Sequence, residues 1–112
     1  MVKRIVIYSL PEGTDPNEFW HYHTKIHSED FKKAVGSKLK GYVMNRITNQ
    51  VGGELKPFAV IETYWESEEE MKKAYDNAKA ATLPNGKTVF EDFMSRIHLL
   101  FAGSVEVKEI QL

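Results

Sequence analysis

Apolar residues along the chain form short runs that are typical of strands. These runs are rich in β-branched and aromatic side chains and predict strands at Lys3–Leu10, Leu39–Thr48, Phe58–Trp65 and His98–Leu112. A short glycine-containing segment joins the second and third runs, so these strands are expected to be antiparallel neighbours in a hairpin. The last strand is long, and Gly103 is a position where it can be kinked by a bulge.

Helical signals begin directly after the first strand. Asp15 can cap the free backbone N–H groups, Pro16 suits the first helical position, and Glu18 can complete a capping box. The helix is expected to run to about residues 34–35, because Gly36 is a typical stop signal.

A second helix is expected after the third strand, where Ser67 and Glu70 have the spacing of a capping box. A turn at Leu83–Gly86 would end that segment, and Thr88–Ile97 is expected to form a short third helix. The face turned inward by the second helix would carry Met71, Ala74, Tyr75 and Ala78.

The resulting order, β-α-β-β-α-β, is that of a ferredoxin-like α+β fold, with an antiparallel four-stranded sheet and helices on one face. The strand sequences are nevertheless apolar on both faces. An open sheet face of that kind would be a large exposed apolar patch. The simplest solution is a homodimer whose sheets pack face to face into an α/β barrel; the alternative is a C-terminal segment that folds across the open face.

Composition and charge restrict the possible functions. A chain of 112 residues with 42% hydrophobic content suits one globular domain, expected over residues 1–112. The formal net charge of −1 argues against a nucleic-acid partner. The chain has no cysteine, which excludes disulfides and thiolate sites. The apolar run Ile5–Tyr8 is too short for a signal peptide or membrane span, so a cytoplasmic protein with no membrane partner is expected.

Candidate chemistry gathers on the first helix, where three of the four histidines lie close together. Helical spacing places Phe19, His23 and His27 on one side of it. An imidazole titrates near neutrality, so His27 can take and return a proton at pH 7. The alternative is a structural histidine at the helix end, bonded to the backbone or to Glu29.

Two further features carry less chemistry. His23 and His27 have an i,i+4 spacing that can bind zinc, but the helix lacks H-E-x-x-H and no third ligand is evident, so no metal is expected. The chain also has no dinucleotide or P-loop motif, and no cofactor is expected.

Glu62 lies within an apolar strand, where a carboxylate needs a partner. An ion pair with Arg46 is the first choice, and a place on the dimer side is the second. His98 opens the last strand, where it either approaches the pocket or caps a turn.

The chain resembles the EthD-like family of the dimeric α/β-barrel superfamily. The first motif is Asp15-x-x-x-Phe19-x-x-Tyr22-x-x-x-x-His27 after the first strand. The second is Ala59-Val60-Ile61-Glu62-Thr63-Tyr64-Trp65-Glu66-Ser67 before the second helix, and the third is Phe90-Glu91-Asp92-Phe93 before the last strand. Together they span nearly the whole chain in the order that the family shows.

This resemblance implies a dimer with a pocket in each subunit between helices and sheet. Members include muconolactone isomerases, polyketide cyclases, dehydratases and proteins associated with ether-degrading oxygenases; relatives in the superfamily are cofactor-free or haem-degrading monooxygenases. His27 matches a histidine used for proton transfer, and Tyr42 matches a pocket tyrosine of the lactone isomerases. The resemblance also suggests a substrate pocket lined by Phe19, His23, Thr63 and Trp65. The run that usually follows the histidine, similar to His-Xaa-Pro-Leu, is here His27-Ser28-Glu29-Asp30.

Three hypotheses follow. The first is a metal-free enzyme that binds a small hydrophobic carbonyl compound and carries out isomerisation, cyclisation or dehydration, with His27 as acid–base and Tyr42 as an orienting donor. The second is a binding or accessory protein without turnover. The third is a cofactor-free or haem-dependent monooxygenase.

Overall fold

Four strands and two helical layers form the molecule, and the computed structural model describes all of residues 1–112. Three strand predictions are confirmed to within two residues at each end. In chain order the elements are β1 (Val2–Ser9), α1 (Pro16–His21), the π-helical η1 (Tyr22–His27), α2 (Ser28–Val35), the short 3-10 turn η2 (Gly36–Lys38), β2 (Leu39–Arg46), β3 (Ala59–Trp65), α3 (Glu68–Ala80), α4 (Val89–Met94) and β4 (His98–Val105).

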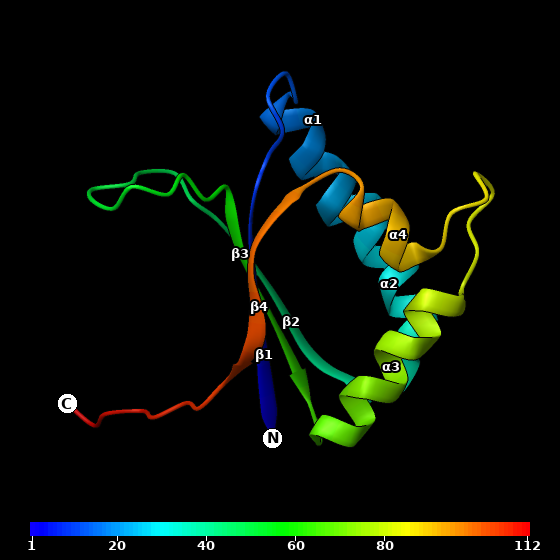
Figure 1. Cartoon of the computed structure of the whole chain (residues 1–112). Helices are drawn as coiled ribbons and strands as arrows, with labels where there is room; N and C mark the ends of the chain where they lie inside the picture. Colours follow the sequence, from blue (N-terminus) through cyan, green and yellow to red (C-terminus); the bar gives the residue numbers. More distant parts are fainter.

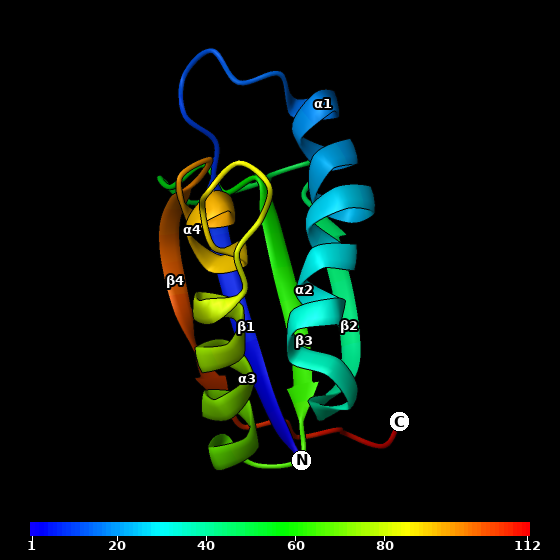
Figure 2. The same ribbon diagram turned by 90° about the vertical axis from the view of Figure 1, so that its right-hand side faces the viewer.

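The strands form one antiparallel sheet in the order β2-β3-β1-β4. All helices lie on the same face of this sheet (Figure 1), with the first helix over β2 and β3 and α3 over β1 and β4 (Figure 2). This arrangement confirms the predicted ferredoxin-like α+β fold.

The first helix is continuous from residue 16 to residue 35 but is not uniform, since a π-helical turn separates α1 from α2. Asp15 accepts a bond from the Glu18 backbone N–H at 2.9 Å, but the Glu18 side chain makes no return bond, so only half of the expected capping box forms. Gly36 ends the helix with a φ of 63°, a conformation that favours glycine. The π turn was not predicted.

The other two helices begin as the sequence predicts. Ser67 accepts a bond from the Glu70 backbone at the start of α3, and Thr88 forms a full capping box with Glu91 at the start of α4. The inner face of α3 is the expected one, with Met71, Ala74 and Ala78 buried and Tyr75 half-buried.

Two expectations about the last strand were wrong. The strand ends at Val105, and residues 106–112 are exposed and extended away from the sheet (Figure 1). The register shift lies at Leu100, where β4 has one residue more than β1, and not at Gly103. Packing instead explains the glycine at position 103, because a Cβ there would lie 2.9 Å from the ring of Phe101.

The predicted Glu62–Arg46 ion pair was also wrong, because the two side chains lie on opposite faces of the sheet. Glu62 bonds to Asn45 at 2.8 Å and forms a salt bridge with Lys3 on the helix-free face. Arg46 instead donates to Asn17 at 3.0 Å on the helical side. The second possibility for Glu62, a place on the uncovered face, describes its position.

The buried core consists of two clusters between the sheet and the helices. One surrounds Trp65 beneath α2 and α3, and the other surrounds Tyr8 beneath α1 and α4. The opposite face of the sheet is uncovered and retains exposed apolar side chains at Val43 (43%), Phe101 (46%) and Val105 (38%). The C-terminal segment does not cover this face.

Candidate functional site

A cavity of about 140 Å³, partly open to solvent, lies between the two core clusters and is lined by the inner face of the sheet and by helical residues. Most side chains around it are apolar. Its wall residues with polar atoms are few: His23 and His27 come from η1, Tyr75 comes from α3, and Arg4, Tyr42 and Thr63 come from three adjacent strands. A small apolar pocket with a few converging polar groups is the usual form of a ligand site.

The π turn places both histidines on the cavity. In η1 the backbone N–H of Ser28 donates to the carbonyl of His23, five residues earlier. Two hydroxyls bond to backbone carbonyls of the preceding turn, Thr24 to Trp20 at 2.8 Å and Ser28 to Thr24 at 2.5 Å, a pattern that distorts helices. Such π turns are frequent at functional sites.

His23 is the more deeply buried histidine and is held by a hydrogen bond. Its Nδ1 lies 2.6 Å from the hydroxyl of Tyr8 on β1. Burial, with a smaller contribution from neighbouring His27, lowers the pKa of His23 to about 3. His23 is therefore neutral at pH 7 and has one ring nitrogen already engaged.

His27 is also buried but has no hydrogen-bond partner at either ring nitrogen, so it is not the structural histidine bonded to Glu29 or the backbone. Its ring stacks on Phe93 with centroids 4.3 Å apart. Burial lowers the pKa of His27 to about 4, Asp92 partly opposes this shift, and Arg96 adds to it. Burial therefore places the pKa of this imidazole below the near-neutral value expected from the sequence, and the ring is neutral at pH 7.

The sheet side of the cavity carries a row of polar side chains. Tyr42 of β2 pairs in register with Thr63 of β3, and Thr63 pairs with Arg4 of β1. Burial raises the pKa of Tyr42, so its hydroxyl remains a proton donor. Thr63 accepts a hydrogen bond from Trp65 Nε1 at 2.9 Å, and its hydroxyl also interacts with the Tyr75 hydroxyl of α3.

Two of the residues suggested for the pocket do not reach the cavity. Phe19 packs in the aromatic cluster around Tyr8, with ring centroids 5.6 Å apart. Trp65 is completely buried and acts through its bond to Thr63. Both side chains lie on the inner side of their helix or strand, as expected. That inner side extends beyond the cavity into the core, where the two residues are buried. His98 is exposed at the start of β4 and is not a wall residue.

Sequence reasoning missed Arg4 and Phe93. The alternation of β1 contained the signal for Arg4, because it places this residue on the same face as Val6 and Tyr8, and both of these face the helices. Phe93 belongs to one of the family-like motifs, but nothing in the sequence shows that it stacks on His27.

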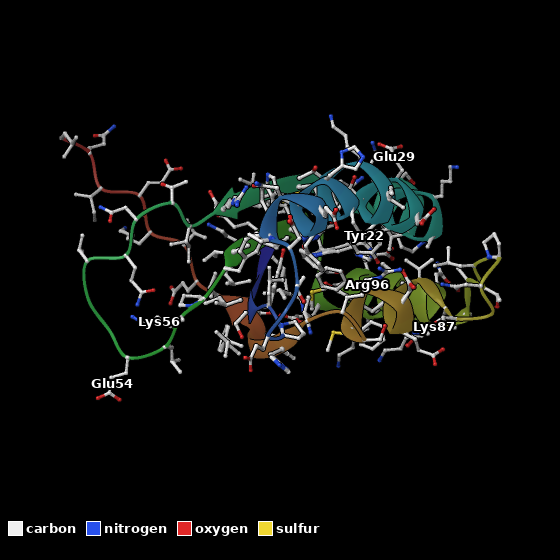
Figure 3. All side chains as sticks on the ribbon, turned by 90° about the horizontal axis from the view of Figure 1, so that it is seen from above. Tyr22, Glu29, Glu54, Lys56, Lys87 and Arg96 are labelled. Atoms are coloured by element: carbon white, nitrogen blue, oxygen red, sulfur yellow. The ribbon has the colours of Figure 1, made fainter.

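A polar network next to the cavity holds α4 in place. Asp92 is buried and accepts bonds from Tyr22 at 2.6 Å, Asn85 at 2.9 Å and Arg96 at 3.4 Å. Burial acts to raise the pKa of Asp92, but these bonds lower it below the ordinary value. Figure 3 shows Tyr22 and Arg96 together between the first helix and α4, where the guanidinium lies 4.2 Å from the ring centroid. The network fixes Phe93, the residue next to Asp92.

The structure brings no three metal-ligating side chains together. It also has no helix of the length and apolar character needed to cross a membrane.

The fold and the cavity define a ferredoxin-like α+β protein. A solved structure of an ethyl tert-butyl ether D (EthD) family protein from Bacillus halodurans C-125 is 25% identical and superposes with a TM-score of 0.72, covering 96% of this chain and 99% of that one. An EthD-like protein from Ralstonia eutropha JMP134 is 20% identical, with a TM-score of 0.67 and coverage of 98% and 94%. A dimeric ferredoxin-like protein from an uncultured marine organism is 13% identical, with a TM-score of 0.62 and complete coverage of both chains.

These likenesses confirm the resemblance to EthD-like proteins that the sequence motifs indicated. No protein-family model matches the chain, and no curated protein shows significant similarity to it.

Proposed function

We propose that the cavity binds a small hydrophobic carbonyl compound and that His27 exchanges a proton with the carbon next to the carbonyl group. The observation that carries this proposal is the state of His27. It is a buried, neutral imidazole on a cavity wall, and neither ring nitrogen has a partner in the protein. Its ring nitrogens are not among the fully buried unpaired atoms of the protein, so they are accessible from the cavity and free to contact a ligand.

The proposed chemistry needs no group beyond the side chains on the cavity wall. His27 takes a proton from the carbon, and the electron pair left behind forms an enolate. The Tyr42 hydroxyl donates a hydrogen bond to the enolate oxygen, and the imidazolium returns the proton to the same or a conjugated carbon. The nearby Asp92 carboxylate stabilises the imidazolium. Isomerisation and dehydration both begin with such a step.

The size of the cavity limits the ligand. An engineered apolar cavity of about 150 Å³ binds benzene, whereas drug-sized ligands occupy roughly 300–1,000 Å³. A cavity of about 140 Å³ therefore suits a single-ring compound or a small lactone. The same comparison makes an extended polyketide or a haem group the less favoured ligand for this chain.

We also propose that the protein forms a homodimer through the helix-free face of the sheet. The loop between β2 and β3 and the C-terminal tail both project on that side of the sheet (Figure 1). Figure 3 shows Glu54 and Lys56 on this loop, far from the helices. These two arms, residues 47–58 and 106–112, carry the exposed apolar side chains Val51, Leu55, Val107, Ile110 and Leu112. Together with the exposed apolar side chains of the sheet face they lie on, these arms suit contact with a second copy, because apolar side chains grouped on one face mark protein–protein contact surfaces.

The catalytic proposal is tested by solvent deuterium exchange, monitored by proton NMR. The purified protein is incubated in deuterated buffer at pH 7 with a five-membered unsaturated lactone, and loss of the signal next to the carbonyl is followed. The wild type is expected to accelerate exchange, and His27→Gln is expected to lose at least 10²-fold of the enzymatic rate. His21→Gln is the matched control, because His21 is an exposed histidine on the same helix. Equal rates for wild type and His27→Gln would contradict the proposal.

A binding or accessory role without turnover is the second candidate. The pKa of His27, about 4, favours it, since an imidazole with that pKa is a weak base until a ligand changes its surroundings. This role predicts that the lactone binds wild type and His27→Gln with similar affinity and that neither protein accelerates exchange.

A further inference from the structure

Arg4 presents an unmatched positive charge to the cavity. It lies on the inner face of β1 and forms part of the cavity wall. Its Nε is buried and has no hydrogen-bond partner, and no carboxylate lies within salt-bridge distance of its guanidinium. The only contact of its Nη1 is a weak one with the sulfur of Met71 at 4.0 Å.

The guanidinium is positioned even though it is unpaired. Its central carbon lies 4.7 Å from the ring centroid of Tyr75 on α3. A cation–π contact of this kind fixes the plane of the guanidinium but leaves the N–H groups at its edge free. Arg4 is half-buried, and its buried Nε donor is left without the acceptor that a buried polar group normally has, so the site can accommodate a group that accepts from this edge.

The surroundings of Arg4 are those of a carboxylate site with an apolar extension. In register across the sheet, Thr63 lies beside Arg4 and can donate its hydroxyl proton. One step further along the strands, Val6, Ile61 and Ala102 form an apolar row that also belongs to the cavity wall. A planar carboxylate bound by two N–H groups of the Arg4 guanidinium would direct an attached ring over this row.

We infer that Arg4 binds the carboxylate of the ligand, so that the cavity takes small unsaturated or aromatic carboxylic acids. This inference rests on the proposed binding of a carbonyl compound in the same cavity, and it narrows that class to anionic molecules. In this arrangement Arg4 and Thr63 hold the acid group. The remainder of the molecule extends across the sheet towards Tyr42, two strands away at about 10 Å.

The test compares benzoate with benzamide, which has nearly the same shape and no charge. Both are titrated into the full-length wild-type protein at pH 7, and affinities are measured by NMR chemical-shift perturbation. Wild type is expected to prefer benzoate by roughly 10- to 100-fold, because a hydrogen bond to a charged group contributes more to the binding free energy than one to a neutral group. Arg4→Met should lose this preference while its affinity for benzamide stays within about twofold, since a neutral ligand does not need the charge.

Arg46→Met is the matched control. Arg46 also lies on the inner face of the sheet and stacks on an aromatic ring, with its guanidinium 5.1 Å from the centroid of Phe58, but it lies outside the cavity. This variant should keep the preference for benzoate. The unliganded melting temperature of Arg4→Met adds a second readout, because removal of an uncompensated cation should leave it unchanged or raise it, whereas loss of a structural arginine should lower it.

The outcomes separate this inference from the proposed catalysis. Equal affinity of the wild type for benzoate and benzamide would overturn the role of Arg4 and leave the carbonyl-binding proposal standing; this comparison needs no variant to fold. A benzoate preference that depends on Arg4, together with no His27-dependent exchange, would support the carboxylate site and contradict the catalysis. Binding of neither compound would overturn both.

Discussion

At the scale of single residues, two tyrosines on the inner face of the sheet differ in what their hydroxyls do. The Tyr8 hydroxyl is bonded to His23 at 2.6 Å, whereas the Tyr42 hydroxyl has no partner in the protein. Tyr8→Phe leaves a buried ring nitrogen unsatisfied and is expected to lower the free energy of unfolding by about 1–3 kcal/mol. Tyr42→Phe should change it by less than about 0.5 kcal/mol. Urea denaturation of both variants measures the difference, and equal losses would show that Tyr42 has a structural role.

The two buried histidines make stability depend on pH. Their pKa values fall from 6.5 to about 3 for His23 and about 4 for His27. Below pH 6.5 the unfolded chain therefore binds protons that the folded chain does not, so stability is full above about pH 6.5 and falls as the pH drops towards 4. The expected slope is about 1.4 kcal/mol per pH unit for each histidine.

Urea denaturation between pH 7 and pH 4.5 measures this slope. His27→Phe keeps the stacking on Phe93 and should reduce the slope to about half, since one of the two titrating groups is removed. His21→Phe should leave it unchanged, because His21 is exposed. Asp92 does not interfere, because its lowered pKa places its titration below this range. A slope that His27→Phe does not alter would contradict the assigned burial of His27.

Much of the site could be predicted from residue spacing, but its electrostatics could not. Helical spacing placed His23 and His27 on one face, and the family resemblance suggested Tyr42 and Thr63; all four line the cavity. The pKa of His27 depends on how many atoms surround it in three dimensions, and spacing along one helix does not contain that information. Phe19 and Trp65, which the resemblance suggested for the pocket, do lie on the inner side of their elements, but a motif does not show how deep in the core a position lies.

At the scale of secondary-structure elements, α4 depends on one buried carboxylate. Asp92 connects the first helix through Tyr22, the preceding loop through Asn85, and α4 itself through Arg96. Asp92→Asn keeps the size and one acceptor oxygen but removes the negative charge that Arg96, Asn85 and Tyr22 bind. The expected loss is about 1.5–3 kcal/mol in the free energy of unfolding, because hydrogen bonds to a charged acceptor become bonds to a neutral one.

Urea denaturation measures this loss, and hydrogen exchange locates it. Amide protection should fall first in residues 82–97, the segment that Asp92 holds. Glu91→Gln is the control, because Glu91 neighbours Asp92 but is exposed on α4. A loss confined to the sheet would contradict the proposed role of this network.

The elements themselves show where sequence signals are strong. Caps at Asp15 and Ser67 marked helix starts correctly because capping is a local interaction. The π turn at Tyr22–His27 was missed, because it arises from a balance between local bonds, such as that of Thr24 to Trp20, and the packing of both histidines against the sheet. The bulge at Leu100 was also missed, since register is a property of a strand pair.

At the scale of the whole molecule, the order of elements and the apolar character of both strand faces were enough to predict the fold and an uncovered sheet surface. On that surface Lys3 neutralises the charge of Glu62 and Asn45 donates a hydrogen bond to it, so the face does not present an isolated charge to a partner. A surface of this kind can be buried without a penalty for an unpaired carboxylate. The homodimer proposal therefore agrees with both the apolar and the polar side chains on this face.

This proposal predicts that a charge on the uncovered face separates the subunits. Phe101 is 46% exposed at the centre of β4, and Phe101→Asp would place a carboxylate in the apolar interface. Ile26→Asp is the matched control, because Ile26 is an apolar residue of similar exposure, 49%, on the outer side of the first helix. Light scattering coupled to size exclusion should give twice the chain mass of 12.9 kDa for wild type and Ile26→Asp, and a single chain mass for Phe101→Asp. A dimer that only Ile26→Asp disrupts would place the interface on another surface. A monomeric wild type would contradict the homodimer proposal.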